Sequence, residues 1–344
     1  MKFVDLQKEY SYFANSIQKN IDEVLVSSRY LFGEQSNKLE NYFKELTEKK
    51  YAVTVKNCTD AIMLVLRCIY KKGMPIILPN FGAYPTAVAC RNYTDLLYYV
   101  DVDNSMTIDI NKLPDKVKNG ILVVVHLFGN NCRMDEIIKY AKTNNHIVIE
   151  DCAQSTGSGS GKQGDYSVFS FYPTKPLSSM GDGGMICTNV DGERLRILRF
   201  YGQNGNKIDE VGINSRMDEF QCAVVNAKIP GYIDLTKKRE EIAQRYKNIV
   251  KGVRVNSNCV YHQFVLRFRK REEILAQLES QGIPYLIHYP YHVSEMKPLK
   301  GKYNRVNFRV NHEIVSLPCH PFMIESEIKK VEGFLYEFRK YEVL

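Results

Sequence analysis

The sequence lacks the segments that would carry the protein into or across a membrane. No charged-then-apolar leader follows Met1, and no uninterrupted apolar run reaches transmembrane length. The nine cysteines are scattered, odd in number and free of C-x-x-C pairs, which favours a reducing compartment over disulfides or structural zinc. We therefore expect a soluble, cytoplasmic protein. We also expect no metal site, because no metal-ligand spacing joins the histidines His126, His262, His312 and His320.

Linkers, internal repeats and low-complexity tracts are also missing from this chain. A chain of 344 residues with 44% hydrophobic residues is long enough to bury one large core and one smaller core. We expect a large domain over residues 1–235, including an N-terminal helical segment, and a small C-terminal domain over residues 236–344.

No nucleic-acid-binding module is visible, although the formal net charge is +8. A basic surface attracts phosphates. Here, however, positive and negative residues alternate, as in the stretch 45–50, and such mixed-sign stretches are typical of solvated faces. We expect no nucleic-acid partner.

The apolar periodicity that is present predicts an α/β protein. Residues 7–50 predict amphipathic helices with Leu25, Phe32, Leu39 and Phe43 facing the core. A long helix at about 217–249 should lead into the small domain, with a strand at 261–268 and a helix at 271–281. Between 51 and 190, β-rich and helical runs alternate, at 51–55, 61–70, 75–78, 97–102, 121–127, 134–142 and 147–150. This alternation predicts a mostly parallel sheet with helices on both faces and a ligand site at the carboxyl ends of its strands.

Residues 147–184 are the most informative segment. An apolar run ends at Asp151, an aromatic strand that includes Ser170 is followed by Lys175, and a glycine cluster follows at 181–184. A carboxylate at the end of a buried strand is either costly or functional. A single lysine is usually a solvated surface residue. Together, the amine, the carboxylate and the hydroxyl are the groups that a pyridoxal phosphate site needs, for a Schiff base, for a protonated ring nitrogen and for phosphate binding.

The start of the predicted helix at 61–70 permits two interpretations. Residues 57–60 can direct backbone N–H groups toward a phosphate at the positive end of the helix dipole. They can equally form an ordinary helix cap, with Thr59 or Asp60 accepting from the first turn, and the residues alone favour the cap.

The order of short motifs along nearly the whole chain resembles that of the DegT/StrS family of sugar aminotransferases, which are fold-type-I pyridoxal phosphate enzymes. The resemblance is carried by Phe3-Val4-Asp5-Leu6, Asn57-Cys58-Thr59-Asp60-Ala61, His126-Leu127-Phe128-Gly129, Glu150-Asp151-Cys152-Ala153-Gln154, the segment 169–175, Gly181-Asp182-Gly183-Gly184 and Gly212-Ile213-Asn214-Ser215-Arg216. It implies the fold-type-I architecture, with a mostly parallel sheet and a smaller C-terminal α+β domain.

The resemblance also implies roles for individual residues. Lys175 would form the Schiff base with pyridoxal 5'-phosphate, Asp151 would hold the ring nitrogen protonated, and Gln154 would bond to the phenolic oxygen or pack beside the ring. Phosphate contacts are implied for Cys58, Thr59, Ser170 and Asn214. In the family the equivalent of Asn214 reaches the neighbouring subunit's cofactor, so a homodimer with shared active sites is expected.

Two parts of the chain depart from the family pattern. Many members have a threonine followed by an aromatic residue that stacks on the pyridine ring, whereas this chain has Gly82-Ala83-Tyr84-Pro85-Thr86. Tyr84 is the nearest stacking candidate, with a packed turn residue as the alternative. The segments between Gln154 and Phe169 and between Gly205 and Gly212 also look short, which would reshape the substrate's entrance.

The implied activity is ping-pong transamination, with pyridoxamine 5'-phosphate as the intermediate form of the cofactor. The family suggests glutamate as the donor and a 3-keto or 4-keto 6-deoxy sugar linked to a nucleotide as the acceptor, in the biosynthesis of an amino sugar. His288 and Tyr289 resemble a segment beside the sugar in some members. Lys175 disfavours the family's dehydratases, which carry histidine there. Amination of a cyclitol or another ketone, and a non-catalytic regulator, stay open as alternatives.

Overall fold

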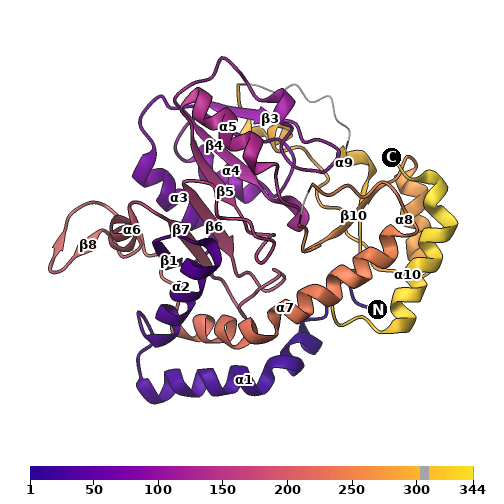
Figure 1. Ribbon diagram of the computed structural model, residues 1–344, viewed down its shortest axis with the longest axis horizontal. Coiled ribbons are helices and arrows are strands. Elements are labelled where there is room, and N and C mark those ends of the chain that lie inside the picture. The colour runs from indigo at the N-terminus through magenta and orange to yellow at the C-terminus, as the bar shows by residue number, and fades with distance from the viewer. Residues whose placement is uncertain (257, 303–309, 344) are drawn as a thin grey trace.

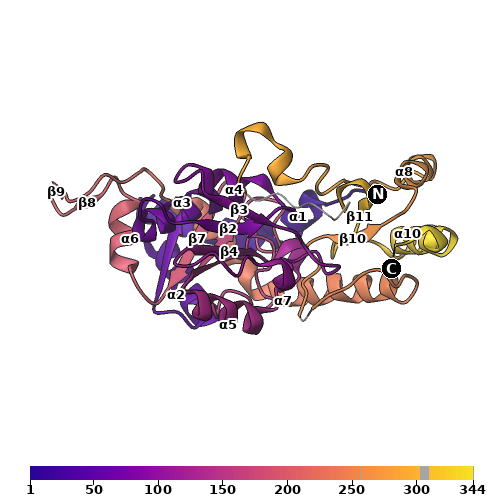
Figure 2. The ribbon, with the colours of Figure 1, turned by 90° about the horizontal axis from the view of Figure 1, so that it is seen from above.

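The computed structural model describes residues 1–256, 258–302 and 310–343. Within them, a seven-stranded sheet forms the centre of the molecule, in the order β1-β7-β6-β5-β4-β2-β3 (Figures 1 and 2). Its strands are β1 (Tyr51–Val55), β2 (Ile76–Pro79), β3 (Leu97–Val100), β4 (Ile121–Val125), β5 (Ile147–Asp151), β6 (Tyr166–Ser170) and β7 (Gly184–Thr188). The strands from β6 to β3 pair in parallel, and β7 is antiparallel to both β1 and β6. The predicted mostly parallel sheet is confirmed.

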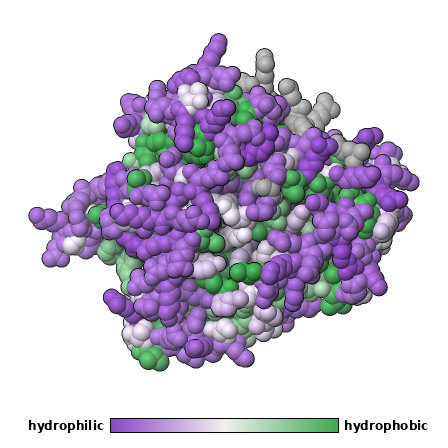
Figure 3. Space-filling view, in the orientation of Figure 1, coloured by the Kyte–Doolittle hydropathy of each residue, from purple (hydrophilic) through white to green (hydrophobic). Residues whose placement is uncertain are grey.

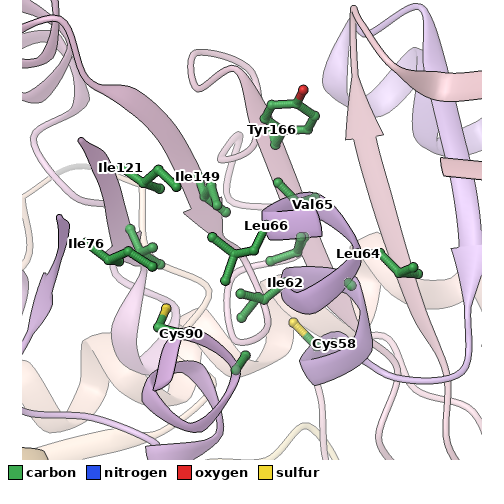
Figure 4. Packing of buried hydrophobic residues seen from close by; sticks show 14 of the residues in the cluster. Cys58, Ile62, Leu64, Val65, Leu66, Ile76, Cys90, Ile121, Ile149 and Tyr166 are labelled. Carbon is green, nitrogen blue, oxygen red and sulfur yellow. The ribbon is translucent and has the colours of Figure 1, made fainter. Parts of the chain in front are cut away.

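Helices cover both faces of this sheet, as Figure 2 shows. They are α2 (Glu34–Thr47), α3 (Cys58–Ile69), α4 (Tyr84–Arg91), α5 (Met134–Asn144) and α6 (Gly192–Leu198). The largest described core cluster lies between α3 and α4 and the strands beneath them, and includes Ile62, Leu66, Ile121 and Ile149 (Figure 4). Burial on this scale stabilises by about 1.5–3 kcal/mol for each large aliphatic side chain. The packing fixes the N-terminus of α3 at the carboxyl end of the sheet.

The structure corrects part of the core that was expected for the N-terminal helices. α1 (Leu6–Ser27) and α2 form as predicted, and Leu39 and Phe43 are fully buried. Leu25 and Phe32 are instead 49% and 37% exposed, so their prediction as core residues is wrong for this chain. Helical periodicity identifies an apolar face but not what covers it. Leu25 lies on the last turn of α1, and Phe32 lies in the turn before α2.

A single helix, α7 (Glu219–Lys247), joins the sheet to the C-terminal region (Figure 1). That region pairs β10 (Phe264–Arg267) with β11 (Ile314–Leu317) and packs α8 (Arg271–Ser280) and α10 (Glu325–Phe338) around a second core. α9 (Val310–Glu313) precedes β11. The proposed domain boundary at residue 235 falls inside α7.

The C-terminal region also returns to the sheet. Short helical turns η3 (Val293–Glu295) and η4 (Lys297–Leu299) lie beside α4, and Val293 and Leu299 belong to the core cluster around α3. A small hairpin of β8 (Gln203–Asn204) and β9 (Lys207–Ile208) projects from the opposite side of the molecule (Figure 1). None of the helices in the described part of the chain has the length and apolar character needed to cross a membrane.

Candidate active site

Asp151 is the last residue of the central strand β5, and its carboxylate is buried and hydrogen-bonded. Its Oδ2 accepts from Thr86 Oγ1 at 2.7 Å, and its Oδ1 accepts from the backbone N–H of Ala153 at 3.1 Å. The thiol of Cys58 lies 3.8 Å from Oδ1. A buried carboxylate is tolerated when such donors satisfy it. Asp151 is therefore held in one orientation at the carboxyl end of the sheet.

Lys175 lies five residues beyond the end of the neighbouring strand β6. Its backbone N–H donates to the carbonyl of Tyr172, closing the turn that brings the side chain back over the sheet. Burial lowers the pKa of Lys175 below its ordinary value of 10.5, while the nearby negative charge of Asp151 raises it in part. A lowered pKa increases the neutral, nucleophilic fraction of the amine.

The N-terminus of α3 forms the third side of the site. Asn57 caps it by accepting from the backbone N–H of Asp60 at 2.8 Å. A Cβ at Gly184 would lie 2.7 Å from the carbonyl carbon of Asn57 and 3.0 Å from the backbone nitrogen of Cys58. Glycine therefore lets β7 approach the start of the helix closely. The cap of Asn57 leaves the first N–H groups of the helix facing the site, a position that suits an anion.

These three parts enclose a cavity of about 470 Å³. It contains the predicted site residues Cys58, Thr59, Asp151, Gln154, Ser170 and Lys175 in its wall. The remaining lining residues are Asn57, Asp60, Ile62, Ala83, Pro85, Thr86, Val125, Ala153, Tyr172 and Asp182. An amine, a buried carboxylate and a helix N-terminus thus face one volume of ligand size.

Gln154 uses both ends of its side-chain amide within the protein. Its Oε1 accepts from the backbone N–H of Phe128 at 2.6 Å, and its Nε2 donates to Tyr289 Oη at 3.0 Å. The ring of Tyr289 lies parallel to that of Phe128, with the centroids 6.4 Å apart. Because both polar ends are engaged, the geometry favours packing beside a ligand over a new hydrogen bond to it.

Four predicted residues lie outside this cavity wall. Tyr84 is 54% exposed at the first position of α4, while its neighbours Ala83 and Pro85 line the cavity. Asn214 is exposed, and its Oδ1 accepts from Arg216 Nε at 2.9 Å. Tyr289 contacts the cavity wall by accepting a hydrogen bond from Gln154 Nε2. His288 donates to or accepts from Ser316 Oγ at 2.9 Å, and burial, with the positive charge of Lys175, lowers its pKa to about 4.

Thr86 and Tyr172 are among the cavity residues that sequence reasoning did not predict as site residues. Thr86 was recognised only as part of a motif, although its hydroxyl is the partner of Asp151. Tyr172 lines the cavity beside Lys175 and is 53% exposed. The available signal was position, since both residues follow the carboxyl end of a strand, at β2 and β6 respectively.

One buried group among the described residues has the composition of a metal site, namely His126, Glu150 and Cys152. Glu150 accepts from His126 Nε2 at 2.9 Å and from the backbone N–H groups of the 161–164 loop. These donors occupy its oxygens. The cluster therefore supports the strand next to Asp151 and does not favour a metal ion.

Comparison with known proteins identifies the family and the fold of this chain. A model of the DegT/DnrJ/EryC1/StrS aminotransferase family matches residues 12–335. The chain belongs to this family. The sequence-based resemblance and the assignment as an aminotransferase are thus confirmed.

Two characterised relatives cover almost the whole aminotransferase chain. The dTDP-3-amino-3,6-dideoxy-alpha-D-galactopyranose transaminase of Aneurinibacillus thermoaerophilus is 34% identical over 355 residues, covering 96% of this chain and 97% of the relative. A pleiotropic regulatory protein of Geobacillus stearothermophilus is 30% identical over 367 residues, covering 98% of each. Several other relatives are nucleotide-sugar aminotransferases by name.

Solved structures agree with this assignment. A DegT/DnrJ/EryC1/StrS aminotransferase from Brucella abortus superimposes with a TM-score of 0.92 at 27% identity, covering 98% of this chain and 99% of that chain. Two structures below 25% identity share the fold. They are NtdA from Bacillus subtilis with bound pyridoxamine phosphate (TM-score 0.90, 23% identity, covering 99% and 85%) and the PLP-form of Spr1654 from Streptococcus pneumoniae (0.83, 18%, covering 95% and 96%).

The residues of the aminotransferase cavity fit pyridoxal phosphate. Lys175 would supply the amine for its aldehyde, Asp151 a carboxylate for its ring nitrogen, and the N-terminus of α3 with Ser170 donors for its phosphate.

Proposed function

We propose that this aminotransferase uses pyridoxal phosphate to move an amino group from glutamate to a 3-keto or 4-keto 6-deoxy sugar linked to a nucleotide. One observation carries the proposal, namely that Lys175 and Asp151 face the same cavity from the ends of neighbouring parallel strands. The names of relatives that transaminate dTDP-linked sugars support the choice of acceptor. The cytoplasmic location predicted from the sequence is part of this proposal.

Each residue of the site has its own proposed role in the reaction. The bound cofactor supplies an electron sink that stabilises negative charge at the donor's α-carbon. Lys175 would hold the cofactor through its amine, and the same amine, when neutral, would move a proton to or from the donor's α-carbon. Asp151, oriented by Thr86, would hold a proton on the ring nitrogen. Gln154 and Tyr289 fix the wall beside the ring, and His288 and Tyr289 are the proposed sugar contacts.

The active form is proposed to be a homodimer with shared sites. Exposed apolar side chains occur near the end of α1 and near the β8–β9 hairpin, and Figure 3 shows a small hydrophobic patch at the lower left, where α1 ends. The exposed members are Leu25, Val26, Tyr30, Leu31, Phe32, Tyr201, Ile208 and Val211. Phe32 contacts the ring of Phe200, on which Arg216 stacks beside Asn214. Exposed apolar patches of this kind mark protein interfaces.

Light scattering of the purified protein tests the dimer. We expect a mass of two chains for the parent and a shift toward one chain when Val26→Asp and Val211→Asp are combined. A parent that scatters as a single chain contradicts the proposed dimer and leaves the cavity chemistry to be tested by itself.

An absorption spectrum tests the activity. We expect a visible band when the parent is mixed with pyridoxal phosphate, loss of that band on adding glutamate, and no band with Lys175→Ala. Nucleotide-linked 3-keto and 4-keto sugars are then screened for their ability to restore the band. A parent without a band contradicts the assignment of the cofactor to Lys175.

A regulatory role is the second candidate, because one relative of similar coverage is named a regulatory protein. The retained Lys175 and Asp151 oppose a purely structural role. A band that forms with pyridoxal phosphate but that glutamate leaves unchanged would favour the regulator.

A further inference from the structure

A second cavity shares Lys175 with the first, and its wall includes Arg239, which has a buried nitrogen without a hydrogen-bond partner in the described residues. Its volume of about 40 Å³ is small, but it exceeds the space needed for a single water molecule. The segment before α1, the turn at Lys175, α7 and the start of β10 form its wall. The lining residues are Phe3, Val4, Asp5, Glu9, Thr174, Lys175, Pro176, Leu235, Arg239, His262, Gln263, Cys319, His320, Pro321 and Phe322.

Arg239 is the unusual member of this wall. It extends from α7, and its Nη1 is buried without a hydrogen-bond partner in the described part of the chain. The Nδ1 of His320 is likewise buried without a hydrogen-bond partner in the described residues, whereas its Nε2 contacts the carbonyl of Lys2 at 3.2 Å. A buried guanidinium N–H left unpaired is costly, more so than a neutral donor. Two residues that line one small cavity thus each carry a buried, unpaired polar atom, a combination that favours a polar ligand.

The acidic residues of the wall are already engaged. Asp5 Oδ1 accepts from Lys2 Nζ at 3.2 Å and from the backbone N–H of Lys8 at 3.1 Å. Glu9 Oε1 accepts from Lys228 Nζ at 2.7 Å and from Ser178 Oγ at 3.3 Å. In the described part of the chain neither carboxylate is hydrogen-bonded to Arg239, so the unpaired N–H of this arginine is available to an anion.

The two histidines of the wall, His262 and His320, carry no positive charge with which to attract that anion. Burial lowers the pKa of His262 well below its ordinary value, and the positive charges of Lys175 and Arg239 lower it further. Burial also lowers the pKa of His320. Both rings are therefore neutral near pH 7, where His320 offers a hydrogen bond and Arg239 provides the full charge.

We propose that Arg239, assisted by His320, binds a carboxylate of the amino donor in the cavity next to Lys175. The proposal rests on the proposed function, since it gives the donor a binding site within reach of the same lysine. Arginine suits this task because its planar guanidinium presents two parallel N–H groups to a carboxylate. A dicarboxylic donor such as glutamate then gains affinity over amines that lack a carboxylate.

Binding of glutarate tests the subsite without requiring turnover. Glutarate carries both carboxylates of glutamate but no amine, and titration calorimetry of the cofactor-loaded protein measures its affinity. We expect Arg239→Gln to weaken glutarate binding by about ten-fold or more, as loss of a charge-assisted hydrogen bond predicts. Lys238→Gln removes the same charge from the neighbouring exposed position of α7 and should leave the affinity unchanged.

A kinetic measurement separates this inference from the proposed function. The glutamate concentration that half-saturates loss of the visible band should rise in Arg239→Gln, while the band formed with pyridoxal phosphate stays the same. A parent without the band would refute the proposed function. A normal band with equal glutarate affinity in the parent and in Arg239→Gln would overturn the Arg239 subsite alone.

If Arg239→Gln does not fold, the more conservative variant Arg239→Lys tests the same proposal. Arg239→Lys keeps the charge but loses the two-pronged geometry, so glutarate binding should fall several-fold. Unchanged affinity in Arg239→Lys would then contradict the proposal. Circular dichroism of each variant establishes that it is folded.

Discussion

The hydroxyl of Thr86 donates to Asp151 Oδ2 at 2.7 Å, and this bond joins the start of α4 to the end of β5. Thr86→Val removes the donor while nearly preserving the shape of the side chain. A hydrogen bond to a charged group contributes about 1.5–3 kcal/mol. We expect the rate of band loss with glutamate to fall by about ten-fold or more, since 1.4 kcal/mol corresponds to a factor of ten. Thr86→Ser keeps the hydroxyl and serves as the control, and equal rates in all three proteins would contradict this role.

The lowered pKa of Lys175 predicts how the amine responds to pH. Burial opposes the ammonium, so the neutral form should dominate at a pH below the ordinary lysine value of 10.5. Asp151 partly opposes this effect by stabilising the charge. Asp151→Asn should therefore shift the midpoint of band formation with pyridoxal phosphate to lower pH. The measurement is the rate of band formation across a pH series, with Lys175→Ala as the blank, and a midpoint that moves upward argues against the assignment.

Tyr289→Phe should lower the stability of the protein through Gln154. Removing the hydroxyl leaves Gln154 Nε2 without the acceptor that Tyr289 Oη provides in a largely enclosed site. An unsatisfied buried donor costs about 1–3 kcal/mol. Tyr291→Phe removes the same atom from a side chain that is 61% exposed, and it should have little effect on the melting temperature. Thermal unfolding of the two variants compares them directly, and equal melting temperatures would show that the Gln154 bond contributes nothing measurable.

Gly184→Ala should weaken cofactor binding by displacing the start of α3. Its Cβ would lie 2.7 Å from the carbonyl carbon of Asn57, closer than real Cβ atoms approach backbone. The matched variant Gly333→Ala introduces the same methyl group in α10, where no atom lies within 4 Å. That change should instead stabilise the protein slightly, by about 0.4–1 kcal/mol. Titration with pyridoxal phosphate measures the first effect, and unaltered affinity in Gly184→Ala would mean that the helix start tolerates the shift.

The sequence identified the parts of the site that depend on local pattern. Asp151 ends an apolar run and Lys175 follows an aromatic strand, so both positions were predictable from their own segments, whereas Cys58 and Thr59 were implied as site residues by the family resemblance. All four residues line one cavity because strands that run parallel bring their carboxyl ends together.

Contacts between distant segments were not predictable in this way. Thr86 and Asp151 are 65 residues apart, and Gln154 and Tyr289 are 135 residues apart, so neither pair leaves a periodic signal. Leu25 has the same apolar character as Leu39, but only the latter is covered within the chain. Pattern alone does not distinguish a core from an exposed apolar face.

Helix α7 has a further consequence for how the protein unfolds. Its first half supplies Cys222 and Val225 to a core beside the sheet, and its second half supplies Ala243 and Tyr246 to the core of the C-terminal region. Neither core can lose this helix and remain packed. We therefore expect both regions to unfold together in one cooperative transition. Amide protons at the two ends of this 29-residue helix should exchange at similar, slow rates.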